Sequence, residues 1–249
     1  MKDATPQTIY LKDYQVPEYL IEKTELVFEL NEDDCKVSSR LHIRRNPNSQ
    51  SKQTDLFLHG GSELDLQQVA LDGVVLASDR YQRSEEGLVI KQVADAAVVE
   101  IDLLIKPHLN TTMMGLYKSR TLYCTQCEAE GFRNITFYLD RPDVMSEFTT
   151  KIVADKTLFP VLLSNGNAVE QGDLENGRHF AIWHDPFKKP AYLFALVAGD
   201  LSVVEDSFTT CTDREILLQI FVEEKDLNKC DHAMLSLKNS MRWDEQTYG

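Results

Sequence analysis

The sequence predicts a mainly β protein, arranged as a sandwich or a curved antiparallel sheet. Three observations lead to this fold class. Apolar and polar residues alternate in short runs from Ile21 to Asp200, as half-buried strands require. Turn-forming residues such as Asp72-Gly73 separate these runs. Apolar residues recur at helical spacing only over Asp226 to Tyr248, so strands rather than helices are predicted to form most of the structure.

The first half of the chain is predicted to form consecutive strands. Leu26, Phe28 and Leu30 share one face, residues 31–34 form a polar turn, and the alternation then resumes, which is a hairpin pattern. Asn46-Pro47-Asn48 and Gly60-Gly61 interrupt the later strands. The strands predicted here cover residues 26–30, 37–43, 55–58, 69–71, 74–76, 88–90 and 98–105.

The second half has longer loops and ends in a helix. We predict strands over residues 148–154, 161–164, 191–199, 201–204 and 216–222, with a tight turn of positive φ at Asn165-Gly166-Asn167. The helix predicted over Asp226 to Tyr248 has Asp226 as its N-cap. It reaches Gly249 with no capping sequence or polar tail, so we expect a larger protein to continue from here.

Composition excludes several classes of protein. Apolar residues make up 43% and charged residues 27%, which is typical of a soluble globular protein. The longest apolar stretch, Ala191 to Val197, is too short to cross a bilayer. The N-terminus lacks the apolar core of a signal peptide, so we expect a cytoplasmic protein with no membrane contact. The formal charge of −14 repels a phosphate backbone, so we expect no nucleic-acid partner.

The five cysteines form an odd and scattered set, which suits a reducing compartment better than a disulfide framework. Cys124 and Cys127 have C-x-x-C spacing. A redox or zinc role would need a helix N-terminus or a second ligand pair, and neither is evident. Two ordinary strand cysteines are the simpler interpretation.

A complete catalytic site is missing from the sequence. None of the six histidines belongs to an H-E-x-x-H motif, and His179 and His184 lie five residues apart in a segment of strand and loop. No G-x-S-x-G elbow, P-loop or dinucleotide fingerprint occurs. We therefore predict no catalytic residue and no metal site within this chain.

Several segments nevertheless resemble one family. Residues 125–133 (TQCEAEGFR) and 136–143 (TFYLDRPD) are similar to the signature of the aminopeptidase N family of zinc exopeptidases, especially its bacterial branch. Residues 163–167, 175–179, 183–187 and 192–200 resemble further family segments in family order, and residues 236–245 resemble the helix that opens its catalytic domain. The resemblance covers essentially the whole chain, and it is most specific from Cys124 onward.

The resemblance implies a fold and a substrate-binding role. It implies that residues 1–200 form a saddle-shaped β domain and that residues 201–249 form the opening strands and helix of a thermolysin-like catalytic domain. By the motif match, Gln126 and Glu128 lie on a loop lent to the active site. Glu128 is implied to bind the free α-amino group of a peptide, and Gln126 to lie beside the first side chain. A cis peptide bond is implied between Glu128 and Ala129.

The resemblance also implies what the chain lacks. The family holds one zinc ion and removes N-terminal residues from peptides. Its G-A-M-E-N segment, H-E-x-x-H motif, third zinc-binding glutamate and catalytic tyrosine would all lie beyond Gly249. We therefore expect zinc in the full-length protein and none in this chain, which should be inactive by itself without the catalytic domain in cis.

Two other functions stay open from the sequence. The chain could be a stand-alone β-sandwich module that binds carbohydrate or a partner protein and never had a catalytic domain. It could also belong to a family member that processes another substrate, such as a leukotriene epoxide, although the bacterial-type motifs disfavour this. An H-E-x-x-H motif in the reading frame after Gly249 would favour the peptidase, and a stop codon would favour the module.

Overall fold

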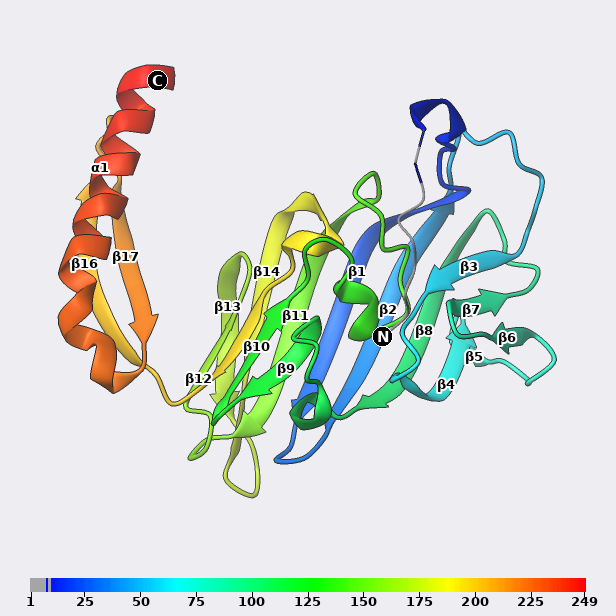
Figure 1. Ribbon diagram of the computed structural model, residues 1–249, viewed down its shortest axis with the longest axis horizontal. Helices are drawn as coiled ribbons and strands as arrows, with labels where there is room; N and C mark the ends of the chain where they lie inside the picture. The colour runs from blue at the N-terminus through cyan, green and yellow to red at the C-terminus, as the bar shows by residue number, and fades with distance from the viewer. Residues whose placement is uncertain (1–7, 9) are drawn as a thin grey trace.

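The computed structural model describes residue 8 and residues 10–249, and it confirms the mainly β fold (Figure 1). The largest sheet has eight strands, in the order β13-β14-β11-β1-β2-β8-β4-β5. The strands of this sheet are β1 (Tyr19–Leu30), β2 (Cys35–Arg45), β4 (Asp65–Leu71), β5 (Val74–Val75), β8 (Ala96–Ile105), β11 (Met145–Asp155), β13 (Asn167–Asp173) and β14 (Arg178–Pro190).

Two smaller sheets cover one face of the large sheet. One has the order β12-β15-β10-β9 and the other the order β3-β7-β6. Their strands are β3 (Leu56–His59), β6 (Tyr81–Arg83), β7 (Gly87–Ile90), β9 (Gly115–Ser119), β10 (Leu122–Gln126), β12 (Val161–Ser164) and β15 (Leu196–Gly199). Short 3-10 helices lie at η1 (Leu11–Asp13), η2 (Pro107–Leu109), η3 (Phe132–Asn134), η4 (Ala191–Leu193) and η5 (Glu224–Lys229).

The alternation in the sequence sets which face of the large sheet is covered. In β1, Leu26, Phe28 and Leu30 are buried, whereas the residues between them lie on the outer face. A single cluster of buried side chains joins all three sheets, and the Phe28 ring stacks on Phe194, with 5.9 Å between ring centroids. The result is a sandwich whose outer face is solvated and carries cross-strand ion pairs such as Arg40 with Glu25.

One central pair of strands departs from the antiparallel pattern. β1 and β11 run parallel, with Lys23 opposite Glu147 and Glu29 opposite Val153. Every other pair in the large sheet is antiparallel. Parallel neighbours need a long connection. Here the connection covers residues 31–144 and contains β2 to β10, which include strands of the large sheet and of both smaller sheets.

A separate unit follows the sandwich. The hairpin of β16 (Ser202–Thr209) and β17 (Glu215–Val222) packs on the helix α1 (Cys230–Tyr248) around a small core of Phe208, Leu218 and Met234. Figure 1 shows this unit standing beside the sandwich. An ion pair of 2.8 Å joins Arg120, in the turn between β9 and β10, to Glu223. The two cores support a boundary near residue 200, which stays a prediction.

Two predicted elements differ in the structure. The strand predicted over residues 191–199 begins as the 3-10 helix η4 and becomes a strand only at Leu196. The Asn165 side chain holds this turn, because it accepts a hydrogen bond from the Ala195 amide at 2.7 Å and donates one to the Leu193 carbonyl at 3.1 Å.

The predicted N-cap of the helix was also wrong. Residues 224–229 form a 3-10 helix, and α1 begins at Cys230 with Lys229 at its N-cap and no side-chain cap. The Asp226 carboxylate instead pairs with Lys225 at 3.3 Å and with Lys229 at 2.5 Å. None of the helices among the described residues combines the length and the apolar character that a membrane span requires.

Candidate functional site

The end of β10 and the loop that follows it, residues 127–131, carry the two residues predicted to bind substrate. Gln126 is the last residue of β10, and both it and Glu128 are exposed. Within the described residues, the Glu128 carboxylate makes no ion pair and no side-chain hydrogen bond. The Gln126 amide donates a hydrogen bond to the Glu128 carbonyl oxygen at 3.0 Å. The peptide bond between Glu128 and Ala129 is cis, as expected.

Buried residues hold both ends of this loop. Cys127 is 3% exposed and Phe132 is fully buried. The Gly131 amide donates a hydrogen bond of 2.7 Å to the Cys127 carbonyl oxygen, which closes the loop. A side chain at Gly131 would place its Cβ 2.4 Å from the Gln126 carbonyl oxygen, so only glycine fits here. The loop therefore presents Glu128 to solvent from a firmly anchored base.

Aromatic packing fixes the position of η3 beneath the loop. The Phe132 ring lies edge-on to three others, with centroid distances of 4.8 Å to Tyr138, 5.3 Å to Phe194 and 6.0 Å to Phe148. Such edge-to-face pairs are favourable contacts beyond the area that they bury. Phe132 thus ties the loop to the core between the large sheet and the covering sheet.

Two arginine–aspartate pairs follow the loop in the chain. Arg133 donates hydrogen bonds from its backbone amide and its Nε to Asp140 Oδ2, at 3.1 and 3.0 Å. Arg141 makes a two-point contact with Asp143, at 2.9 and 2.7 Å, and donates a further bond of 2.7 Å to the Gln15 carbonyl oxygen. Each arginine is held by its aspartate, which suits a structural role.

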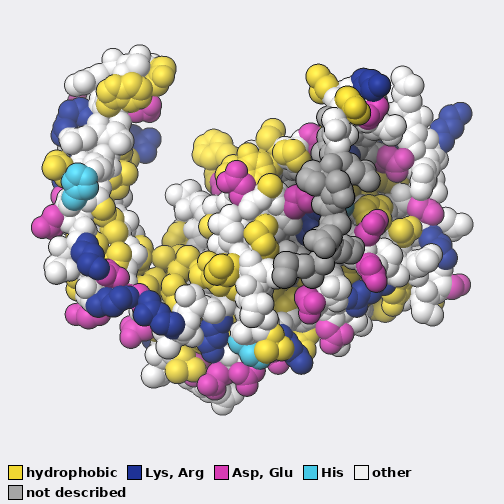
Figure 2. Space-filling model, in the orientation of Figure 1, with side chains coloured by type: hydrophobic (Ala, Val, Ile, Leu, Met, Phe, Trp, Pro, Cys, Tyr) yellow, Lys and Arg dark blue, Asp and Glu magenta, His cyan; other side chains and the backbone are white. Residues whose placement is uncertain are grey.

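Exposed apolar side chains lie near the loop. Met145, Phe187 and Leu193 are 52%, 80% and 50% exposed, and we call this set the apolar rim. Met145 pairs with Pro190 at the end of β11 and β14, and η4 follows directly, next to the Phe194 that packs on Phe132. Figure 2 shows hydrophobic side chains gathered along this upper edge of the sandwich, on the side facing α1.

The other candidate residues do not converge on a site. Burial raises the pKa of the Cys127 thiol to about 12, so Cys127 is not a thiolate at neutral pH, and Cys124 lies in β10. His179 shares a hydrogen bond of 2.8 Å with the Phe159 carbonyl oxygen, and His184 one of 3.1 Å with the Thr149 hydroxyl. These are ordinary structural contacts of strand residues.

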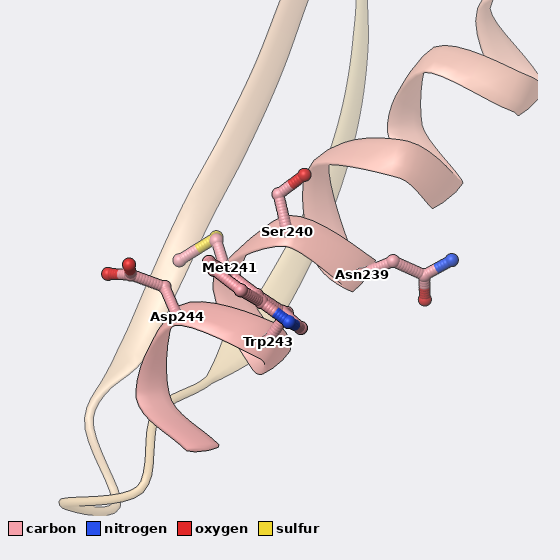
Figure 3. Close-up of a pocket in the computed structure, with 5 residues that line it drawn as sticks. All are labelled: Asn239, Ser240, Met241, Trp243 and Asp244. Carbon is pink, nitrogen blue, oxygen red and sulfur yellow. The ribbon is translucent and has the colours of Figure 1, made fainter. Parts of the chain in front are cut away.

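No group of three metal-ligating side chains occurs within the described residues, so they do not fit a zinc ion. A hollow along α1 is lined by Asn239, Ser240, Met241, Trp243 and Asp244. Figure 3 shows that these side chains come from one helix and diverge from one another. The hollow therefore offers no converging polar groups. A second hollow, on the outer face of the large sheet, contains Arg40, whose charge Glu25 and Glu100 already neutralise.

Sequence reasoning did not single out Glu130 or the apolar rim. Glu130 is exposed and its carboxylate lies 3.3 Å from Arg133 Nη2, a contact that only the folded loop creates. The rim residues belong to strand ends and a 3-10 turn, where the alternation of apolar residues gives no reliable face. No sequence signal could have separated these exposed apolar residues from core residues before the strand ends were known.

Comparison with known proteins identifies the family. Residues 16–193 match the model of the peptidase M1 N-terminal domain. The chain is 47% identical over its whole length to aminopeptidase N of Caulobacter vibrioides, and 46% identical over 98% of its length to aminopeptidase N of Escherichia coli. It spans only 28% and 27% of the lengths of those two relatives.

A solved structure agrees with this match. The fold superimposes on Legionella pneumophila aminopeptidase A, solved in complex with aspartic acid, with a TM-score of 0.90 and 32% identity. The alignment covers 96% of this chain and 28% of that one. The resemblance recognised in the sequence is thereby confirmed. The chain belongs to the M1 peptidase family and carries its N-terminal domain.

Proposed function

We propose that this chain is the N-terminal part of a zinc-dependent aminopeptidase and that it recognises the free N-terminus of a peptide substrate. The observation that carries the proposal is the Glu128 carboxylate, which is exposed on an anchored loop and makes no ion pair with the described residues. A carboxylate in that state can accept short, charge-assisted hydrogen bonds from an ammonium group. An internal peptide nitrogen cannot make these bonds, so the contact selects chain ends.

Gln126 has a supporting role in this proposal. Its side chain is exposed at the end of β10, two residues before Glu128, and its amide group already contacts the loop backbone. An amide carries both donors and an acceptor. We propose that Gln126 lies beside the first side chain of the peptide and contributes to orientation and selectivity.

The proposal includes a catalytic domain in cis and one zinc ion held there. The aminopeptidase N relatives are more than three times as long as this chain, which covers 28% of the first of them. A further domain could pack on the apolar rim beside the loop, because contiguous exposed apolar groups mark interaction surfaces. The zinc and the groups that activate water would come from that domain, since the described residues offer no ligand cluster.

A cytoplasmic location is also proposed. All five cysteines, buried and exposed alike, are free thiols. Free thiols persist in reducing compartments. A stand-alone binding module is not favoured, because the chain aligns along its whole length with aminopeptidases.

The test is a substitution at Glu128 in the full-length protein. We expect Glu128→Ala to weaken substrate binding by about 2–5 kcal/mol, since the ammonium group loses its charged partner. Steady-state kinetics with an aminoacyl anilide measures this as a fall in kcat/KM. Glu170→Ala, which removes an exposed carboxylate from the edge strand β13, is the matched control. Unchanged kcat/KM in the Glu128 variant would refute the proposal.

A further inference from the structure

The loop carries two carboxylates in different electrostatic situations. Glu128 and Glu130 are both exposed and lie two residues apart. The Glu130 carboxylate lies 3.3 Å from Arg133 Nη2, whereas that of Glu128 has no charged partner within the described residues. An arginine beside one carboxylate neutralises it and leaves the other free. Arg133 therefore distinguishes the two glutamates.

Arg133 also joins the loop to a buried group. The side chain of its partner Asp140 is only 2% exposed. One oxygen of this carboxylate, Oδ2, accepts hydrogen bonds from both the backbone amide and the Nε of Arg133. The Arg133 Nη2 donates a further bond of 3.0 Å to the Asp140 backbone oxygen. Removing the partner of such a buried carboxylate is strongly destabilising, because it leaves an uncompensated buried charge. One guanidinium thus links the buried Asp140 to the loop carboxylate Glu130.

We propose that Arg133 is a positioning residue for substrate recognition. Held by Asp140, it fixes the Glu130 end of the loop and thereby keeps the Glu128 carboxylate free and correctly placed for the substrate ammonium group. Arg133 itself touches no substrate in this arrangement. The inference rests on the proposed role of Glu128, and it adds the residue that makes that role possible.

The experiment is a double-mutant cycle in the full-length protein. The variants are Glu128→Ala, Arg133→Met and both together, and the ligands are a substrate-like inhibitor with a free α-amino group and its analogue without that group. We expect Arg133→Met to weaken binding of the inhibitor that has the amino group and to raise KM, each by about tenfold. The value of kcat should stay within about threefold of the original, because only substrate recognition is disturbed. In the Glu128→Ala background, Arg133→Met should weaken binding of the amino inhibitor by less than a further factor of about two. The reason is that the effects of substitutions at residues that act as a unit are not additive.

Two controls separate positioning from a general loss of structure. The analogue without the amino group should bind all variants within about twofold, because it never used Glu128. Arg40→Met removes a paired arginine from the outer face of the large sheet and should leave both inhibitors unaffected. If Arg133→Met does not fold, Arg133→Lys carries the test, since it keeps the charge but loses the forked contact, and about threefold weakening is expected.

The outcomes distinguish the two proposals. Equal loss for both inhibitors, or the same tenfold loss with and without Glu128, would overturn the positioning role of Arg133 alone. No loss of the amino inhibitor in the single Glu128→Ala variant would instead refute the proposed function.

Discussion

Glu128 and Glu130 have the same side chain and lie on the same loop, yet their surroundings differ. Glu130 has an arginine beside it at 3.3 Å, whereas Glu128 makes no ion pair with the described residues. The family resemblance implies a binding role for Gln126 and Glu128 from the motif alone, and this role stays a prediction. Which carboxylate is free could not be derived from the motif, because it depends on where Arg133 and the buried Asp140 meet.

A second ion pair predicts how stability depends on pH. Hydrogen bonds from Arg141, and then from Tyr14, lower the pKa of Asp143 below 3.8. The charged form is therefore favoured by folding, and its contribution is present above pH 3.8 and lost as the pH falls through the lower, folded pKa. We expect Asp143→Asn to reduce the free energy of unfolding at pH 7 by about 1 kcal/mol, since the pair is partly solvated.

Urea unfolding between pH 7 and about pH 3 measures this effect. The Asp143→Asn protein should lose less stability across the acid range than the unmodified protein, because it has no carboxylate to protonate at that position. Asp33→Asn, in the exposed turn after β1, is the matched control and should keep the original profile. If the free energy of unfolding depended on pH in the same way in the Asp143→Asn and unmodified proteins, Asp143 would not be a source of the acid sensitivity.

At the scale of elements, the hairpin β16–β17 and the helix α1 form a unit with its own core. Phe208, Leu218 and Met234 are buried together, and none of them belongs to the core of the sandwich. The alternation of apolar and polar residues over 216–222 predicted the strand. Which element covers the apolar face of this strand became clear only from the packing of α1. This separate core predicts local rather than global unfolding when it is damaged.

Leu218→Ala should destabilise this unit by roughly 2–4 kcal/mol, because it opens a cavity in a very small core. Hydrogen exchange should report lost protection over residues 202–248, with β1 and β11 unchanged. Leu217→Ala is the matched control, since Leu217 is the neighbouring residue on the opposite face and is 62% exposed. An equal loss of protection in β1 would mean that the two cores unfold together.

At the scale of the whole molecule, the sandwich exposes the loop that carries Glu128 and the apolar rim on the same edge. The helix α1 also exposes large apolar side chains, among them Trp243 at 59% and Leu235 at 57%. These surfaces are consistent with the proposal that a further domain completes the site. The relatives, of which this chain covers 27–28%, are long enough to contain such a domain.

The isolated chain provides the corresponding test. We expect the purified 249-residue chain to release no amino acid from an aminoacyl anilide, with or without added zinc, because the described residues contain no cluster of metal ligands to activate water. Full-length protein assayed in parallel is the positive control. Metal-dependent turnover by the isolated chain would reveal a catalytic site that the described residues do not explain.

The sequence by itself determined the β class, most strand positions and the family. These depend on local alternation, turn residues and short motifs, all of which can be read along the chain. It gave the wrong start for α1 and the wrong form for residues 191–195, because these depend on which polar groups meet in space, namely Asp226 with Lys229 and Asn165 with Ala195.

Only the tertiary structure decided the parallel pairing of β1 with β11 and the apolar rim. Each of these depends on residues far apart in the chain or on strand ends, where alternation no longer marks a face. The pairing of strands 122 residues apart, from Thr24 to Ser146, shows the reason directly, since their hydroxyls lie 2.8 Å apart in the core. Contacts of this range are set by packing and carry no local pattern.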